Sequence, residues 1–326
     1  MTFAKTNAFD FIVSTPAGTP DAGVAIAASR AGALGVLDLE FSPDPAAAAL
    51  EVTRLLEAGR GRCAVRLPAG HHETLPALLN GAPRPLDAVL LTDPDDAGLA
   101  VAVATVQAHH ARALVVVTDA AQARVAEAAG ADALVAKGHE AGGWVGEEST
   151  YVLLQRVIAG AGVPVYAHGG IGRHTVGACL VAGAAGAVLD AQVLLARESP
   201  LDDVARRRIA ALDGSETACL GQDLGARLRC FSRPDLAPAR ALTETELRLR
   251  AGEDDPDATL ATWRDAALAA VDWTDLDASV LALGQDACFA AALAERFVTV
   301  GGILDGLRGR AGRARPAPRA RSTPSC

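Results

Sequence analysis

The residues most able to do chemistry lie in two glycine-rich segments, each of which follows a short apolar run. The first, from Gly138 to Gly146, holds four glycines in nine residues, and the second is Gly169-Gly170-Ile171-Gly172. Glycines after a strand let backbone N–H groups approach an anion, and the dipole of a following helix adds attraction. The two segments therefore predict a phosphate-bearing cofactor at the mouth of a parallel barrel. A plain tight turn and a surface loop are the alternative interpretations.

Three side chains beside these glycines could take part in a reaction. Lys137 is one of only two lysines among 30 basic residues, and it ends an apolar run, where a barrel side chain points into the active site. Its ammonium group could stabilise negative charge on a cofactor or a substrate carbonyl. His139 and His168 flank the same face, and either imidazole could act as a general acid near neutral pH. The simpler alternatives are a surface lysine and two hydrogen-bonded structural histidines.

Eight short apolar runs recur along the chain with helix-like runs between them. They span residues 11–14, 35–39, 64–67, 88–91, 113–117, 133–136, 163–167 and 187–189. The runs are continuously apolar rather than alternating, as expected of strands that are covered on both faces. Eight such units predict an α/β fold, a (β/α)8 TIM barrel over residues 1–198. An open doubly wound sheet is the alternative.

The pattern changes after about residue 197. Residues 199–305 predict a mainly helical subdomain packed on the barrel, with helix starts at a capping box from Thr243 to Glu246 and at Asp255-Pro256. Residues 306–326 hold six arginines, three prolines and no acidic residue, which predicts a disordered basic linker.

Composition excludes several classes of protein. Half of the 326 residues are hydrophobic, but no apolar run reaches the roughly 20 residues of a membrane span, and the N-terminus lacks a signal-peptide pattern. We therefore predict a cytoplasmic protein with no membrane partner. The net charge of −9 argues against nucleic acid as a partner. Six scattered cysteines without a CxxC pair predict reduced thiols and no metal site.

The glycine segments resemble those of the flavin-binding barrel family that comprises nitronate monooxygenases (2-nitropropane dioxygenases) and FMN-dependent bacterial enoyl-acyl-carrier-protein reductases. The resemblance extends over most of the chain. Residues 14–18 are similar to the family's first strand, and residues 283–285 resemble the segment that closes over the flavin. Residues 137–144 and 213–217 look closer still to nitronate-monooxygenase-like domains at the N-terminus of large type I polyketide or polyunsaturated-fatty-acid-like synthases. In that setting the basic tail would lead to further synthase domains.

The resemblance implies FMN as cofactor, NAD(P)H as an electron donor, and either an acyl chain on a carrier protein or a small molecule as substrate. It also allows a homodimer. The residues that it implies around FMN are Pro16, Ala17, Gly18, Lys137, Gly142, Gly143, Gly169, Gly170, Asp190, Ala191, Gln192 and Gln285. The candidate catalytic residues are Lys137, His139, His168 and, at the position of the family's catalytic histidine, Trp144.

Three positions depart from the family's pattern. Trp144 replaces the catalytic histidine, and an indole cannot exchange a proton at neutral pH. Asp190-Ala191 replaces a Gly-Thr pair, and a carboxylate beside a phosphate is unfavourable unless it points away or pairs with a cation such as Arg197. Arg66 stands nearest to a ring-contacting asparagine.

Three functions remain open from the sequence. The first is an FMN-dependent oxidoreductase domain of a polyketide- or fatty-acid-type synthase that reduces carrier-bound enoyl thioesters. The second is a catalytically degenerate barrel with a structural or docking role. The third is a nitronate monooxygenase that uses a different base.

Overall fold

A closed barrel of eight parallel strands forms the centre of the computed structural model, which describes residues 9–18, 21–42, 45–94, 98–233, 235–252, 255–273 and 275–313. The strands are β1 (Asp10–Ser14), β2 (Leu34–Asp38), β3 (Cys63–Pro68), β4 (Ala88–Thr92), β5 (Arg112–Val117), β6 (Ala133–Lys137), β8 (Val165–His168) and β9 (Gly186–Leu189). Neighbours in this order pair with each other, and β9 closes the barrel on β1. The predicted (β/α)8 barrel is confirmed, and each predicted strand lies within two residues of an observed one.

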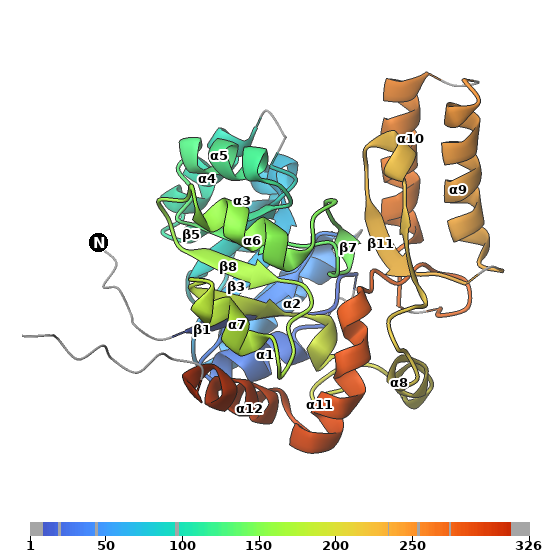
Figure 1. The fold of residues 1–326 in the computed structure, drawn as a ribbon. Coiled ribbons are helices and arrows are strands. Elements are labelled where there is room, and N and C mark those ends of the chain that lie inside the picture. Colours follow the sequence, from blue (N-terminus) through green and yellow to red (C-terminus); the bar gives the residue numbers. More distant parts are fainter. Residues whose placement is uncertain are drawn as a thin grey trace, which may run out of the picture.

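Helices surround the barrel. They are α1 (Gly23–Arg30), α2 (Pro45–Ala58), α3 (Leu75–Leu78) with the preceding 3-10 turn η1 (Ala69–Thr74), α4 (Leu99–Ala108), α5 (Ala120–Ala128), α6 (Thr150–Ile158) and α7 (Val176–Val181). No such helix directly follows β9. Instead α12 (Val300–Arg313) packs against both α7 and α1 and completes the ring (Figure 1).

The position of α12 corrects two predicted boundaries. The barrel does not end at residue 198, because its last helix comes from residues 300–313. The linker predicted over 306–326 begins later, since residues up to Arg313 are helical; the rest of that prediction lies outside the described residues. The buried residues of this helix recur at helical spacing: Val300, Ile303, Leu304, Leu307 and Ala311. Glycines and arginines lie between these apolar residues, so the composition of the segment resembles that of a linker.

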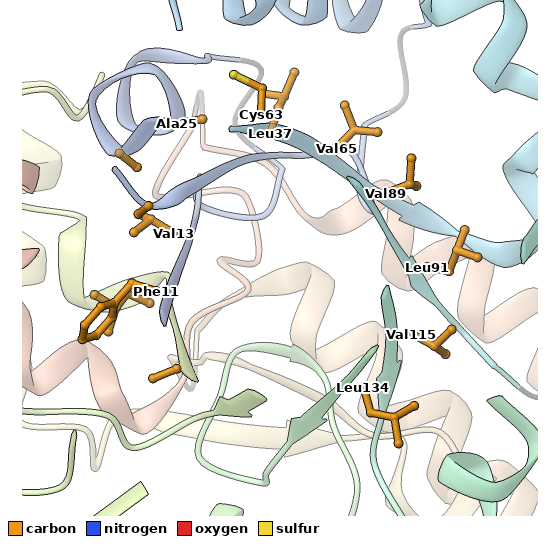
Figure 2. Packing of buried hydrophobic residues seen from close by; sticks show 14 of the residues in the cluster. Phe11, Val13, Ala25, Leu37, Cys63, Val65, Val89, Leu91, Val115 and Leu134 are labelled. Carbon is orange, nitrogen blue, oxygen red and sulfur yellow. The ribbon is translucent and has the colours of Figure 1, made fainter. Parts of the chain in front are cut away.

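The strands alternate their side chains between two apolar layers. Ile12, Val36 and Leu90 point into the barrel, whereas Val13 and Val65 point outward to the helices. Figure 2 shows the outward layer, with Val65, Val89, Leu91 and Val115 on successive strands. Burial on both faces explains why the strands read as unbroken apolar runs.

Residues 191–299 form a subdomain that covers the carboxyl end of the barrel. Its elements are η2 (Ala191–Val193), α8 (Asp203–Ala210), β10 (Thr217–Leu220), η3 (Gln222–Leu224), β11 (Leu228–Phe231), α9 (Ala237–Arg250), α10 (Pro256–Ala270), η4 (Gln285–Phe289) and α11 (Ala290–Phe297). The α9–α10 pair stands apart from the barrel helices (Figure 1). The β10–β11 hairpin pairs with β7 (Gly143–Trp144), which lies in the first glycine segment.

This subdomain differs from the prediction in two respects. The β10–β11 hairpin has no counterpart in the predicted helices. The capping box at Thr243 is also wrong, because α9 starts at Ala237 and the Thr243 hydroxyl donates to the Ala239 carbonyl inside the helix. The predicted start at Asp255 is confirmed, since its carboxylate accepts from the Ala258 N–H.

Within the described residues no single helix is long and apolar enough to cross a membrane, although η4–α11 and α12 together pass that test with a 99° bend between them. Five cysteines carry free thiols, and Cys326 lies outside the described residues.

Candidate functional site at the carboxyl end of the barrel

A buried ion network fills the barrel mouth at the ends of β2 and β3. The parallel register places Asp38 beside Arg66. Arg66 Nη1 lies 3.2 Å from Asp38 Oδ2, and its Nη2 lies 2.8 Å from Glu40 Oε2. No side chain of the three is more than 4% exposed. Burial raises the pKa of Asp38 to about 6 against the opposing charge of Arg66. The arginine therefore stands inside the mouth as part of a fixed ion network.

Lys137 lies at the end of β6, as predicted, and is 1% exposed. Its Nζ has no hydrogen-bond partner among the described residues. Burial and the nearby Arg66 charge lower the pKa of Lys137 to about 8, although the Glu40 carboxylate opposes the shift. A Cβ at Gly143 would lie 3.5 Å from this Nζ, so the first glycine segment runs close beside it.

His168 is the neighbour of Lys137 on the next strand, β8. His168 Nε2 lies 2.8 Å from Asp190 Oδ2, which follows β9. Burial lowers the pKa of His168, and the Asp190 carboxylate offsets part of this effect. Burial alone would raise the pKa of Asp190, but His168 and the Ala191 N–H hold it below its ordinary value. An ionised carboxylate only accepts, so a neutral His168 donates from Nε2.

Arg197, the cation predicted as a possible partner of Asp190, is not its partner. Arg197 is exposed, whereas His168 is the residue in contact with the carboxylate. The register of β8 and β9 brings the two strand ends together, and sequence spacing alone does not reveal this.

The second glycine segment has the backbone shape of an anion-binding loop. Gly169 and Gly170 both have positive φ, 113° and 62°, which residues with a side chain rarely adopt. One N–H group of this loop and two of its neighbour nevertheless have internal acceptors. Gly172 N donates to Thr175 Oγ1 at 2.7 Å. On the neighbouring loop, Asp190 N donates to Gln192 Oε1 at 2.8 Å and Ala191 N to Asp190 Oδ1 at 2.6 Å.

Asp286, which the sequence analysis did not single out, faces the same loop. It is buried, and Gln192 Nε2 donates to its Oδ2 at 3.0 Å. Burial raises the pKa of Asp286 well above its usual value, the Asp190 charge adds to this, and the Gly170 N–H partly opposes it. Gln285, the predicted cofactor residue, is exposed. The sequence did contain a signal for Asp286, because it is the one charged residue in the mainly apolar stretch from Leu281 to Ala290.

A third carboxylate, that of Glu140, occupies the start of α6. Its Oε2 accepts from Thr150 N at 2.9 Å and from Thr150 Oγ1 at 2.8 Å. A Cβ at Gly169 would lie 2.6 Å from that same hydroxyl oxygen. Acidic side chains of the chain itself thus lie where a helix N-terminus and a glycine loop would otherwise attract an anion.

Three other predicted cofactor residues, Ala17, Gly18 and Gly142, lie against segments between residues 271 and 284. A Cβ at Gly142 would collide with the Ala282 carbonyl oxygen, so this glycine lets residues 282–284 cross closely. Ala17 O accepts from Trp273 Nε1 at 2.8 Å, and a Cβ at Gly18 would lie 3.0 Å from Val271 Cγ1. The loop from Pro16 to Gly18 is therefore covered by the second subdomain.

Trp144 and His139 have structural surroundings. The Trp144 ring stacks on Phe41 and tilts against Trp263, with both centroid distances at 6.0 Å. His139 Nδ1 lies 3.1 Å from Gly146 O, and its Nε2 contacts the Arg229 guanidinium. Because both ring nitrogens are engaged and the indole does not titrate, neither side chain is placed for proton transfer.

Five of the twelve predicted cofactor residues line one cavity, which is too small for the cofactor: Pro16, Ala17, Gly142, Asp190 and Ala191. Residues of the first loop (Pro16, Ala17), the ion network (Asp38, Arg66) and the β9 loop (Asp190, Ala191) line it, and its volume is about 10 Å³. That is room for one water molecule, whereas ligand sites typically measure about 300–1,000 Å³. In this arrangement the cavity does not admit FMN, and the Ala191 N–H beside it already donates to the Asp190 carboxylate. No group of three or more His, Cys, Asp or Glu side chains in the described part of the chain could hold a metal ion.

Comparisons with known proteins identify what the chain resembles. The sequence profile of the nitronate monooxygenase family matches residues 96–285, more than half of the chain. A segment of 103 residues is 42% identical to the (3aS,4S,5R,7aS)-5-hydroxy-7a-methyl-1-oxo-octahydro-1H-indene-4-carboxyl-CoA dehydrogenase of Mycobacterium tuberculosis, and it covers 29% of each protein.

Two solved structures share the whole architecture. FabK from Thermotoga maritima has a TM-score of 0.74 at 22% identity, over 95% of this chain and 94% of that one. Nitroalkane oxidase from Streptomyces ansochromogenes has a TM-score of 0.69 at 23% identity, over 95% and 98% of the two chains. At such identities the likeness establishes the fold alone.

Proposed function

Because the chain belongs to the nitronate monooxygenase family, whose oxidoreductase fold it has, we propose that it is a member that works without a flavin. Its role is then structural or docking, as a barrel domain of a polyketide- or fatty-acid-type synthase. The synthase setting rests on the resemblance of residues 137–144 and 213–217 to such domains.

One observation carries the proposal: three backbone donors of the two loops already donate to the chain's own side chains. The Ala191 N–H is 2.6 Å from Asp190 Oδ1, the Asp190 N–H is 2.8 Å from Gln192 Oε1, and the Gly172 N–H is 2.7 Å from Thr175 Oγ1. A bound phosphate would have to displace these acceptors and would then face the negative charge of Asp190 in a buried setting. The volume of only about 10 Å³ in the cavity that five of the predicted cofactor residues line adds a steric argument.

An FMN-dependent reductase is the second candidate, and Lys137 favours it. A buried ammonium group without a hydrogen-bond partner among the described residues is unfavourable, and an anionic partner supplied from outside would relieve the cost. Under this candidate NAD(P)H is the electron donor and a carrier-bound enoyl thioester the substrate. It requires the Arg66 network and the β9 loop to rearrange.

Turnover with supplied cofactor distinguishes the two candidates. The purified chain is mixed with FMN, NADPH and an enoyl thioester, with Lys137→Ala as the matched variant and circular dichroism to verify folding. The proposal predicts no NADPH oxidation by either protein. Oxidation by the wild type that Lys137→Ala abolishes would establish the reductase instead.

A further inference from the structure

A second cavity, separate from the one at the cofactor position, opens beside β3, β4 and β5. Its volume is about 110 Å³. Arg66 and Thr92 lie at its inner end, Val116 and Trp144 supply apolar wall, and Arg264 stands at the rim. An engineered cavity of about 150 Å³ is known to hold benzene, so a ligand of four or five heavy atoms is the size that fits here.

Three of the residues that line this cavity each have a buried polar atom without a hydrogen bond. The three atoms are Arg66 Nε, Thr92 Oγ1 and Glu40 Oε2. The Arg66 and Glu40 side chains are 4% and 3% exposed, and Thr92 is 3% exposed. Although Glu40 Oε2 lies 2.8 Å from Arg66 Nη2, no aligned N–H reaches it. A buried polar atom without a hydrogen bond lowers the stability of the fold, so three such atoms beside one cavity indicate a ligand that supplies the missing hydrogen bonds.

The unsatisfied atoms define the chemistry of that partner. Arg66 Nε can only donate, an ionised Glu40 can only accept, and the Thr92 hydroxyl can do either. A carboxamide matches this set, since its carbonyl accepts from the arginine and the threonine while its N–H donates to the glutamate. A carboxylate would supply no donor and would be repelled by Glu40.

The rim is already charge-balanced, which favours a neutral ligand. Arg264 pairs with Asp93 at 2.8 Å and lies over the Trp144 ring, and Arg227 pairs with Glu147. The Arg264 and Asp93 side chains are 37% and 41% exposed, so the rim is accessible from solvent.

From this geometry we infer that the cavity is a binding site for a small primary carboxamide, either a free molecule or the amide end of a longer one. Its apolar wall of Val116, Val145 and Trp144 takes the alkyl group. The cavity shares Arg66 with the small cavity at the predicted cofactor residues, and Trp144 and Val145 belong to the first glycine segment. The inference therefore rests on the proposed function, in which no flavin is bound.

Titration of the folded wild-type chain with acetamide, followed by NMR, tests the site. For a ligand of this size we expect saturable binding with a dissociation constant on the order of millimolar. N,N-dimethylacetamide, which has no N–H, and acetate should each bind at least about fivefold more weakly, since each loses a hydrogen bond to a buried group.

Two threonine variants give the matched comparison. Thr92→Val removes the hydroxyl at constant shape and should weaken acetamide binding about fivefold. Thr245→Val, on α9 and outside the lining of this cavity, should leave binding unchanged. Equal affinity for acetamide and N,N-dimethylacetamide in the wild type, or no saturable binding, would mean that the cavity holds water only. Unchanged acetamide affinity in folded Thr92→Val would also overturn the inference.

Discussion

His168 Nε2 lies 2.8 Å from Asp190 Oδ2, so two residues at adjacent strand ends form a closed pair at the loop where the family resemblance implies a phosphate. Each satisfies the other, and Asp190 also accepts from its neighbour Ala191. The carboxylate thus acts as a built-in anion for the loop that follows β9. The barrel keeps the family's backbone and has internal acceptors at its anion sites.

The first prediction concerns the strength of this pair. His168→Ala leaves a buried carboxylate without its imidazole donor, and we expect the free energy of unfolding to fall by about 3 kcal/mol. Urea denaturation measures the change, with His174→Ala on the exposed surface as the control. A loss no larger than that of the control would show that the pair is not structural.

Asp286 provides the second prediction. Burial raises the pKa of Asp286 well above its usual value and so disfavours the charged form, and asparagine is close to a neutral aspartic acid in shape. Asp286→Asn should therefore change the free energy of unfolding at neutral pH by less than about 1 kcal/mol. Asp286→Ala, which also loses the Gln192 bond, should be clearly less stable. If asparagine destabilises as much as alanine, the carboxylate is needed in its charged form.

Lys137 predicts a dependence of stability on pH. The folded-state pKa is about 8 against 10.5 for the unfolded chain, so between these values the unfolded state binds more protons and stability rises with pH. The gain should be on the order of 3 kcal/mol and should be complete above pH 10.5. Lys137→Met removes the titrating group. Denaturation curves from pH 7 to 11 should show the rise in the wild type and its loss in the variant; parallel profiles would contradict the account.

Trp144→His restores the residue type that the family uses for catalysis. We expect no oxidation of an alkyl nitronate, even with added FMN, because the position faces Phe41 and Trp263 in an aromatic cluster. We expect a loss of about 2 kcal/mol in the free energy of unfolding, because two aromatic contacts disappear. Oxygen consumption and urea denaturation measure the two effects. Flavin-dependent oxygen consumption by this variant would show that the site is still competent.

The barrel strands could be predicted because each carries its signal locally. Residues such as Val115 and Leu114 are buried on opposite faces of one strand, so the run is apolar without interruption. The helix α12 was only partly recognised, since its glycines and arginines resemble a linker. The short hairpin β10–β11 gives little pattern, and its partner β7 is two residues long and far away in sequence.

The site was predicted in outline but not in its contacts. Lys137 and His168 were identified because they end apolar runs. Asp286 was missed because its role depends on a contact with Gln192, 94 residues away, which no local pattern encodes. Gln285 was predicted to contact the cofactor because residues 283–285 match a family motif, but its side chain is exposed. A motif match identifies a segment and does not give the orientation of each side chain in it.

The visible absorption spectrum of the purified wild-type chain, before and after incubation with excess FMN and removal of unbound flavin, tests the central claim most directly. We expect no flavin absorption in either sample, because the Asp190 carboxylate already accepts from the Ala191 N–H, and Asp38, Arg66 and Asp190 line a cavity of only about 10 Å³. A flavin spectrum that corresponds to one FMN per folded chain would contradict it.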